Sequence, residues 1–320
     1  MLTQLTPIAY DAAATAPKWD AFISEIFRDD RELIQYVQRV VGYSLTGVVS
    51  ERAFFVLYGS GRNGKSVFLE TLKALLGDYA AAFNPEALML HREGHHPADL
   101  AMLRGIRLAY AQETGEGRRL NEPLVKSLCG GDTITVRRMR ENPWQMQPTF
   151  KTWMITNSKP LIYETGTAMW DRVKLVPFLF TVDESAKVPL HVLVNQFISN
   201  EGAGILRWAV EGCAAYLKDG LPEPAAVRNE IASYRDDMDL LGRFLAECCD
   251  TGSDDYTVTP DELFAAYVQW CQRSGEDAWL GGVFARKLTE RGYERKTERV
   301  GKGTRKIRTG VRLKPGTVYP

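Results

Sequence analysis

One eight-residue motif constrains this chain of 320 residues more than any other feature. Residues 59–66, Gly-Ser-Gly-Arg-Asn-Gly-Lys-Ser, fit the pattern G-x-x-x-x-G-K-S. The apolar run AFFVLY (53–58) precedes the motif and is typical of a strand buried on both faces. An amphipathic helical pattern follows as far as Leu76, with Gly77 behind it. A strand, a glycine-rich loop and a helix in this order predict a loop that binds the phosphates of a nucleotide.

The loop predicts ATP and Mg²⁺ as cofactors. Glycines allow backbone N–H groups to curl around phosphate oxygens, Lys65 is expected to reach the β- and γ-phosphates, and Ser66 is expected to ligate Mg²⁺. The alternative is a glycine-rich turn that carries Lys-Ser by chance, and the full spacing and context argue against it. The residues expected to contact the nucleotide are Gly59, Ser60, Gly61, Arg62, Asn63, Gly64, Lys65, Ser66 and Val67.

The rest of the pattern predicts an α/β fold with a parallel sheet. Short apolar runs at 106–111, 152–156 and 173–180 are typical of further strands, and helical patterns lie between them. Strands that alternate with helices favour parallel pairing. Another helix is expected at 205–217. Residues 259–262, Thr-Pro-Asp-Glu, predict a capping box at the start of a further helix.

The chain is expected to have three parts. Residues 1–50 predict an N-terminal helical segment of two helices, with Gly42 as the cap of the second. Residues 51–220 form the predicted ATPase core. Residues 221–320 are expected to hold a linker, rich in Pro, Gly and charge over 218–230, and a separate C-terminal domain.

Polar residues at three strand boundaries are candidates for catalysis. Glu113 ends the second core strand and can polarise the attacking water and support the metal, although Gln112 stands where an Asp is usual. Asn157 ends the next strand and can touch the γ-phosphate or the water, but Asn is also a common turn residue. Arg172 precedes the last strand and is either half of a surface ion pair or an arginine finger for a neighbouring subunit.

Charge is balanced overall but not along the chain. Lys and Arg total 40, as do Asp and Glu, whereas the segment from Phe284 to the C-terminus holds twelve bases and three acids. A basic helix (282–291) and two strand-like stretches around 301–303 fit a winged-helix domain that binds nucleic acid. The alternative is a basic face that docks on an acidic protein surface. The candidate DNA contacts in this region are Arg286, Lys287, Lys302, Arg305 and Lys306.

The composition excludes other classes of protein. No apolar run approaches the roughly 18 residues that a membrane span needs, and the N-terminus lacks the pattern of a signal peptide. The five cysteines form no C-x-x-C motif or disulfide ladder. We therefore expect reduced thiols, a cytoplasmic location and no membrane partner.

Four ordered segments carry a resemblance to a known family: GSGRNGKSVF (59–68), LRGIRLAYAQETGEGRRLNEPLVKSLCGGDTITVRRM (103–139), PTFKTWMITNSKP (148–160) and AMWDRVKLVPF (168–178). They resemble the superfamily 3 helicase domain of phage and plasmid primase-helicases, the satellite-phage type related to the poxvirus enzyme. The resemblance implies an AAA+-like P-loop core with a parallel sheet, after an N-terminal helical segment and before a C-terminal winged-helix domain. It also implies a homo-oligomeric, hexameric ring that moves along single-stranded DNA, typically 3′ to 5′.

The same resemblance implies roles for single residues. Lys65 and Ser66 bind phosphate and Mg²⁺, Glu113 is the catalytic carboxylate that also supports the metal, Asn157 is the sensor and Arg172 is the trans-acting finger. Residues 130–150 become a hairpin that contacts DNA.

The hairpin is also predicted from its own residues. β-rich stretches flank a plausible turn at 140–143, and Arg137, Arg138 and Arg140 can contact phosphates. Trp144 can stack on a base, although a packed hairpin aromatic is the simpler interpretation. Lys151 starts the next strand and is expected to face the DNA or the nucleotide.

These observations predict an ATP-dependent DNA helicase of phage- or plasmid-type replication, acting on single-stranded and forked DNA. The alternatives are a nucleotide-switched initiator that binds origin duplex with little unwinding, and an unrelated P-loop enzyme such as a small-molecule kinase. Only about fifty residues precede the ATPase core, so no primase activity is expected in this chain, and a primase partner would be fused or separate.

Overall fold

The structure is a computed structural model that describes residues 4–90, 98–112, 115, 117–164, 166–183, 188–301 and 303–315. The chain divides into two compact units, Met1–Arg235 (unit 1) and Asp236–Pro320 (unit 2). Each unit has its own hydrophobic core, so each is described by itself.

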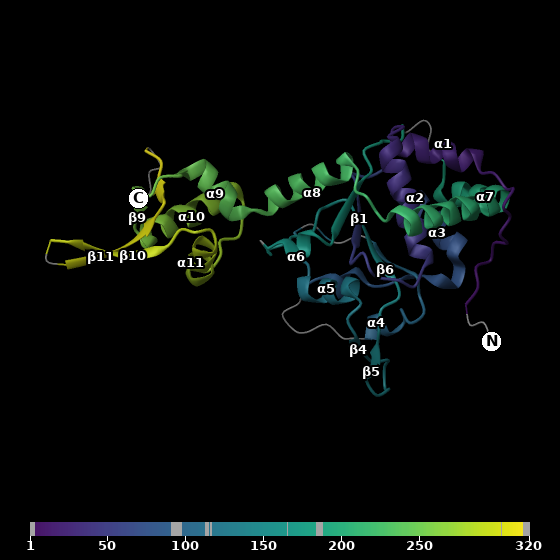
Figure 1. Ribbon diagram of the computed structural model, residues 1–320, viewed down its shortest axis with the longest axis horizontal. Helices are drawn as coiled ribbons and strands as arrows, with labels where there is room; N and C mark the ends of the chain where they lie inside the picture. The colour runs from purple at the N-terminus through teal and green to yellow at the C-terminus, as the bar shows by residue number, and fades with distance from the viewer. Residues whose placement is uncertain are drawn as a thin grey trace. The chain divides into compact units, whose positions relative to one another are not determined.

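A five-stranded parallel sheet forms the centre of unit 1, which confirms the predicted α/β class (Figure 1). The strands are β1 (Phe54–Tyr58), β2 (Ala80–Ala82), β3 (Leu108–Gln112), β6 (Lys151–Thr156) and β7 (Val173–Pro177). Their order is β2-β3-β6-β1-β7. Because β1 lies between β6 and β7, the loop that follows β1 emerges at the carboxyl ends of the strands, between two neighbouring strands.

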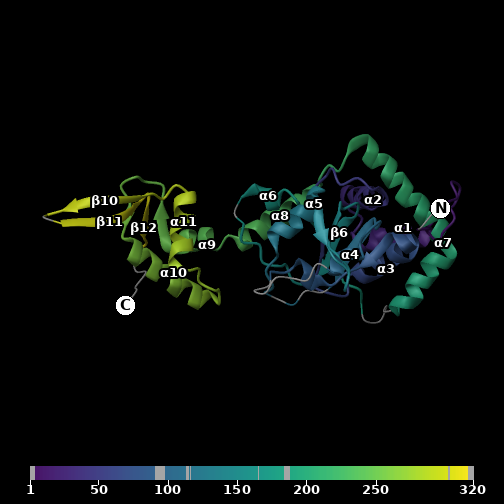
Figure 2. The same ribbon diagram turned by 90° about the horizontal axis from the view of Figure 1, so that it is seen from below.

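Helices α1 (Pro17–Ile26), α2 (Arg31–Leu45), α3 (Lys65–Leu76) and α7 (Leu190–Asp219) share one core with one face of the sheet. Alternate strand residues such as Phe55 and Leu57 point into this core, as the two-residue period of a strand requires. Figure 2 shows α7 as a long helix on the outer side of α2 and α3. The predicted N-terminal helical segment therefore packs directly on the sheet, with Tyr43 of α2 against Phe55 of β1, and α2 also contacts α7.

The opposite face of the sheet is covered by shorter elements. These are α4 (Ala98–Ala101), α5 (Glu122–Gly130) and α6 (Thr167–Trp170), with a 3-10 turn at Pro85–Leu88 (η2). The other 3-10 turn, Gly77–Tyr79 (η1), follows α3, and its Tyr79 packs against the core of the first face. Helix α5 contacts β6, with the thiol of Cys129 beside Thr152, which places α5 against this face.

Gly42 does not end α2, contrary to the prediction, because the helix continues to Leu45. A Cβ atom on Gly42 would lie 2.0 Å from the backbone nitrogen of Cys213 on α7. The reciprocal contact is as close, since a Cβ on Gly212 would lie 2.1 Å from the carbonyl oxygen of Gln38. Gly42 is thus a packing residue that lets α2 and α7 cross closely.

Helix α8 (Ala225–Met238) replaces much of the predicted linker. Its Val227 and Tyr234 are buried in unit 1, and the Tyr234 hydroxyl donates a hydrogen bond to the carbonyl oxygen of Pro160. The Tyr234 ring also packs edge-on against Trp170, at 5.2 Å between ring centroids. Residues 225–230 of the predicted linker are therefore helical.

Unit 2 is built from three helices and short strands. In chain order they are α9 (Leu240–Cys248), β8 (Cys249–Thr251), β9 (Thr257–Val258), α10 (Pro260–Ser274), α11 (Gly281–Glu290), β10 (Arg295–Val300), β11 (Gly303–Thr309) and β12 (Val311–Leu313). The strands pair as β10-β11-β9 and β12-β8. The predicted capping box of Thr259 and Glu262 at the start of α10 is confirmed. Across the described residues of both units, no helix is long and apolar enough to span a bilayer.

Candidate nucleotide site and nucleic-acid interface

The glycine-rich loop joins β1 to α3 at the carboxyl edge of the sheet. Gly64 caps α3 with a φ of +82°, and Gly61 has a φ of +104°. Backbone in this left-handed region favours glycine. No atom lies within 4 Å of the position that a Cβ on Gly61 would take. The loop therefore offers open space next to backbone N–H groups at a helix N-terminus, which suits a phosphate.

Lys65 lies inside the loop and is only 5% exposed. Its Nζ donates hydrogen bonds to the carbonyl oxygen of Gly59 at 2.7 Å and to Oδ1 of Asn63 at 2.8 Å. Both acceptors are neutral, and burial lowers the pKa of Lys65 to about 8. A buried ammonium group held by neutral oxygens lacks a counter-charge, so these residues fit an anionic ligand such as a nucleotide phosphate.

Asn63 ties the loop to the segment that follows β7. It is 2% exposed, and its Nδ2 donates to the carbonyl oxygen of Phe178 at 2.9 Å. The backbone nitrogen of Val182 donates to the carbonyl oxygen of Arg62 at 2.8 Å. Gly59 is required here, because a Cβ would lie 2.0 Å from Nδ2 of Asn63. The loop and the 178–182 segment therefore form one hydrogen-bonded layer.

The residues expected to support metal and water are only partly described. Ser66 is exposed at the start of α3, and Asn157 is exposed directly after β6. Glu113 lies outside the described residues, but its neighbour Gln112 ends β3 and pairs with Ile155 of β6. Among the described residues no three acidic, His or Cys side chains gather at one point. Mg²⁺ bound with a nucleotide needs only one or two protein ligands beside phosphates and waters, so Ser66 fits this role.

Arg172 lies at the amino-terminal ends of the parallel strands, whereas the glycine-rich loop lies at their carboxyl ends. The carbonyl oxygen of Arg172 accepts a hydrogen bond from the backbone nitrogen of Phe54 at 2.7 Å, and Phe54 is the first residue of β1. Gly59 is reached only after the whole of β1, and at about 3.3 Å per residue the two levels are roughly 20 Å apart. An arginine side chain cannot bridge that distance, so Arg172 does not reach the phosphate loop of its own chain.

Arg172 is held at the end of α6. Its guanidinium donates to the carbonyl oxygen of Ala168, and the guanidinium makes no ion pair with any described acid. Its Nε is buried without a hydrogen-bond partner among the described residues. The surface ion pair that the sequence left open is therefore not formed within the described part of the chain.

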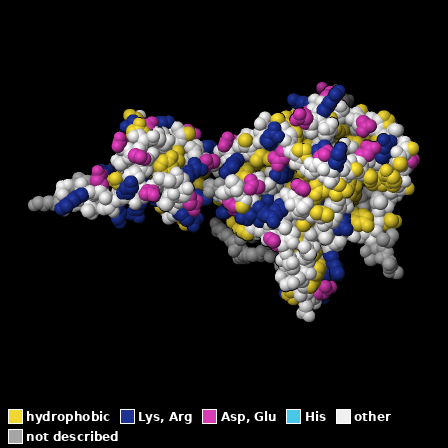
Figure 3. Space-filling view, viewed as in Figure 1, with side chains coloured by type: hydrophobic (Ala, Val, Ile, Leu, Met, Phe, Trp, Pro, Cys, Tyr) yellow, Lys and Arg dark blue, Asp and Glu magenta, His cyan; other side chains and the backbone are white. Residues whose placement is uncertain are grey.

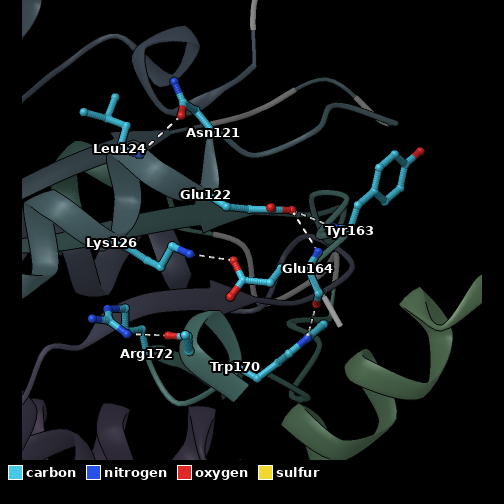
Figure 4. Close-up of polar contacts among 9 residues, drawn as sticks. Asn121, Glu122, Leu124, Lys126, Tyr163, Glu164, Trp170 and Arg172 are labelled. Atoms are coloured by element: carbon cyan, nitrogen blue, oxygen red, sulfur yellow. Dashed lines mark hydrogen bonds and ion pairs between the residues drawn. The ribbon is translucent and has the colours of Figure 1, made fainter. Parts of the chain in front are cut away.

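A polar network fixes the segment that carries α6 and Arg172 (Figure 4). Glu122 of α5 is 8% exposed, and its Oε1 accepts from the backbone nitrogens of Tyr163 at 2.7 Å and Glu164 at 3.2 Å. The carboxylate of Glu164 pairs with Lys126 at 2.6 Å, and its carbonyl oxygen accepts from Nε1 of Trp170 at 2.9 Å. The sequence did not predict this network, because Glu122 and Glu164 find their partners about forty residues away along the chain.

The predicted hairpin at 130–150 is present. Strands β4 (Ile134–Val136) and β5 (Trp144–Met146) pair antiparallel, with Val136 opposite Trp144. Arg137, Arg138 and Arg140 lie exposed in the connection between the two strands. The hairpin therefore presents all three predicted arginines to solvent.

Lys151 does not face DNA or the nucleotide, so that expectation is wrong. It is 2% exposed, and its Nζ donates to the carbonyl oxygen and, at 3.1 Å, to Oγ1 of Thr46. The ammonium also lies 4.4 Å from the ring centroid of Tyr43. Lys151 instead ties the start of β6 to the end of α2.

The basic residues of unit 2 differ in how free they are. Arg286 and Lys287 both lie within 4 Å of Glu290 on α11, and Arg305 lies 3.5 Å from Glu262. Lys306 is exposed on β11, whereas Lys302 lies outside the described residues. Figure 3 shows Lys and Arg side chains on the hairpin of β10 and β11 and on nearby surface of unit 2.

Arg308 has a structural role, which the sequence pattern did not distinguish from the exposed basic residues around it. It is 3% exposed, and its guanidinium donates to Oγ1 of Thr289 and to the carbonyl oxygens of Tyr293 and Ala285. These bonds attach β11 to the end of α11. Side chains alternate between the two faces along β10 and β11, and Arg299 and Lys306 lie on the same face as Arg308.

Comparison with known proteins gives three findings. A model of a family of unknown function, DUF5906, matches residues 57–172. The chain is 28% identical over 250 residues to "Putative helicase L207/L206" of Acanthamoeba polyphaga mimivirus, which covers 71% of this chain and 25% of that protein. It is 24% identical over 269 residues to "Putative helicase 022R" of Frog virus 3, covering 78% and 27%.

A third relative is "Putative primase C962R" of African swine fever virus, 23% identical over 240 residues, with 69% of this chain and 25% of that protein covered. The chain thus spans about a quarter of the length of these curated relatives. Two apo structures of the C-terminal region of NrS-1 share the fold. Their TM-scores are 0.53 and 0.51 at 9% and 12% identity, with 95% and 96% of this chain and 79% and 77% of those chains covered. In sequence the chain is therefore similar to proteins named as helicases and primases of large DNA viruses, and in fold to the NrS-1 C-terminal region, in agreement with its resemblance to the superfamily 3 primase-helicases.

Proposed function

We propose that the chain is the motor of an ATP-dependent DNA helicase that acts in DNA replication as a homo-oligomeric, hexameric ring. The observation that carries the proposal is the separation of two charged groups. Lys65 lies in the phosphate loop without a counter-charge, at the carboxyl ends of the strands, and Arg172 lies at their amino-terminal ends. Such an arrangement is completed when the Arg172 edge of one subunit meets the loop of the next.

In this proposal the loop residues bind ATP with Mg²⁺. Lys65 leaves the oxygens of Gly59 and Asn63 and takes the β- and γ-phosphates, and Ser66 ligates the metal. Glu113 polarises the attacking water, and Asn157 senses the γ-phosphate from the end of β6. The neighbour's Arg172 neutralises the charge that develops during transfer, a role that requires the orientation held by Glu122 and Glu164.

Hydrolysis is coupled to DNA through the β4–β5 hairpin, which carries three exposed arginines. Single-stranded and forked DNA are the proposed substrates, with movement from 3′ to 5′. A primase, fused or separate, is a proposed partner because one relative is named as a primase.

Unit 2 supports a second, compatible role in binding duplex DNA. The order helix, strand, two helices and hairpin, with β9 paired to β11, supports a winged-helix domain. Its exposed bases Arg286, Arg305 and Lys306 are the proposed phosphate contacts, with Lys287 and Lys302. An initiator that binds origin duplex and unwinds little is the alternative function that this domain favours.

The deciding experiment measures ATP turnover of the full chain with and without oligo-dT. The helicase proposal predicts turnover that rises with single-stranded DNA and disappears in Lys65→Ala. Turnover that ignores oligo-dT but responds to duplex would favour the initiator. Turnover that ignores both would reject a DNA-coupled motor.

A further inference from the structure

An open cavity lies at the base of the β4–β5 hairpin, apart from both the phosphate loop and the hairpin tip. It has a volume of about 540 Å³. The side chains that give it character are Arg104, Arg107, Trp144, Gln145, Met146 and Gln147. Its described lining contains two guanidinium groups, an indole and two amides, but no carboxylate.

The positive charge of this cavity is not neutralised within the described residues. The guanidinium of Arg104 lies 5.3 Å from the centroid of the Trp144 ring, and that of Arg107 lies 6.0 Å from the centroid of Tyr79. Neither arginine forms an ion pair with a described acid. The charge of Arg107 also contributes, after burial, to the lowered pKa of Lys151. Two guanidinium groups therefore line the cavity without a counter-charge among the described residues.

Trp144 gives the same cavity a flat apolar surface. The indole is half-exposed at the start of β5, and its position is fixed by pairing with Val136 and by the guanidinium over its ring. Figure 3 shows hydrophobic and basic side chains next to one another on the hairpin, which projects from unit 1. Aromatic and guanidinium planes stack on nucleobases, arginines bind phosphates, and Gln side chains can pair with base edges.

We propose that this cavity binds one nucleotide unit of single-stranded DNA, with the base stacked on Trp144 and the phosphate held by Arg104 and Arg107. The inference rests on the proposed function and adds a subsite to it. The hairpin tip then supplies only phosphate contacts through Arg137, Arg138 and Arg140. The cavity beneath the hairpin instead holds the nucleobase, which keeps the DNA strand in register while the ring moves.

The test uses the full chain with a nucleotide analogue and measures binding of labelled oligo-dT by fluorescence anisotropy at several salt concentrations. Trp144→Ala should weaken binding by about 5- to 150-fold, the range for loss of one stacked base, without changing the salt dependence. Trp144→Phe should retain most of the affinity. The double variant Arg104→Ala/Arg107→Ala should flatten the log–log salt slope by about 0.7, since the one phosphate that both arginines hold contributes roughly 0.7 on a single strand.

Two controls make the result specific. Arg207→Ala/Lys218→Ala removes the same charge from α7, away from the cavity, and should bind oligo-dT as the unchanged protein does. An oligonucleotide with abasic sites should bind the unchanged protein more weakly and should abolish the difference between it and Trp144→Ala.

The outcomes separate the cavity from the proposed function. If the unchanged protein binds oligo-dT and its ATPase responds, but the cavity variants bind within twofold of it, the cavity proposal is overturned and the motor stands. The proposal also fails if Trp144→Ala loses as much affinity for the abasic strand as for oligo-dT. If the unchanged protein binds no single-stranded DNA at all, both proposals fail.

Discussion

Arg172 gives the sharpest test of a site shared between subunits. Roughly 20 Å of β1 separates its level from the phosphate loop of the same chain. An arginine finger contributes on the order of 10³–10⁵ in rate, so Arg172→Ala should reduce ATP turnover of a pure preparation by about that factor. Lys65→Ala should abolish turnover, because the β- and γ-phosphates lose their cation. The two defects differ in place, because one removes the finger and the other removes the phosphate cation.

Mixing the two variants should restore activity if Arg172 acts on its neighbour. In a ring of head-to-tail interfaces, a site works when an Arg172→Ala subunit supplies Lys65 and a Lys65→Ala subunit supplies Arg172. Random mixing at equal amounts makes about a quarter of the interfaces competent, whatever the number of subunits. ATP turnover should therefore rise from near zero to about a quarter of the unmixed, unchanged protein, with its maximum at equal amounts.

A matched control mixes the unchanged protein with the double variant Lys65→Ala/Arg172→Ala. A site shared between subunits gives turnover that falls with the square of the unchanged fraction, to about a quarter at equal amounts. A site within one subunit gives a linear fall, to about half. Mixed assemblies are verified by native mass measurement. A linear fall, together with no recovery at any ratio of the two single variants, would refute the shared site.

Three further predictions address other parts of the chain. Glu113→Gln should bind ATP and fail to cleave it; loss of binding in a fluorescent-nucleotide titration would assign Glu113 to structure instead of catalysis. Burial lowers the pKa of Lys151 from 10.5 to about 7 in the folded protein. Between these two pH values the unfolded chain therefore binds more protons than the folded protein does. The free energy of unfolding should then rise with pH across this window, by at most about 1.4 kcal/mol per pH unit. Urea unfolding at pH 7 and pH 9.5 should show this rise in the unchanged protein and a smaller one in Lys151→Met, and equal rises would contradict the burial argument. Deletion of residues 239–320 should leave nucleotide binding intact and reduce the salt slope of duplex binding by about 0.9 per lost phosphate contact, whereas an unchanged slope would remove unit 2 from the DNA.

The place of that deletion depends on the structure. A cut at Pro222 would follow the predicted linker, but it would remove α8 and with it the buried Val227 and Tyr234. Their loss would expose Trp170 beside the segment that carries Arg172. A cut after Met238 keeps the whole of α8 and removes unit 2 from residue 239 onward.

The elements that the sequence predicted well are those with a local signal. Strands β1, β3, β6 and β7 lie within two residues of the predicted starts, because each is a short apolar run. The glycine-rich loop and the capping box of Thr259 have residue patterns with a direct backbone meaning. The hairpin at 130–150 also has flanking β-rich stretches and a turn.

The features that the sequence could not predict depend on distant partners. Lys151 is buried because Thr46 and Tyr43, about a hundred positions earlier, supply its acceptors and an aromatic face. Glu201 in the middle of α7 accepts from the backbone nitrogens of Lys18 and Trp19 and so caps α1. Lys and Glu side chains are usually exposed, so no local pattern in the sequence predicts that Lys151 and Glu201 are buried.

The opening of a forked DNA duplex by the full chain tests whether the protein is a DNA-unwinding motor. We expect a labelled strand to be released in the presence of ATP and Mg²⁺, and release to stop in Lys65→Ala and in Arg172→Ala. No release is expected when a non-hydrolysable analogue replaces ATP, because binding alone does not complete the cycle. Strand release that persists in both variants, or ATP turnover stimulated by DNA without any release, would contradict the account of a DNA-unwinding motor.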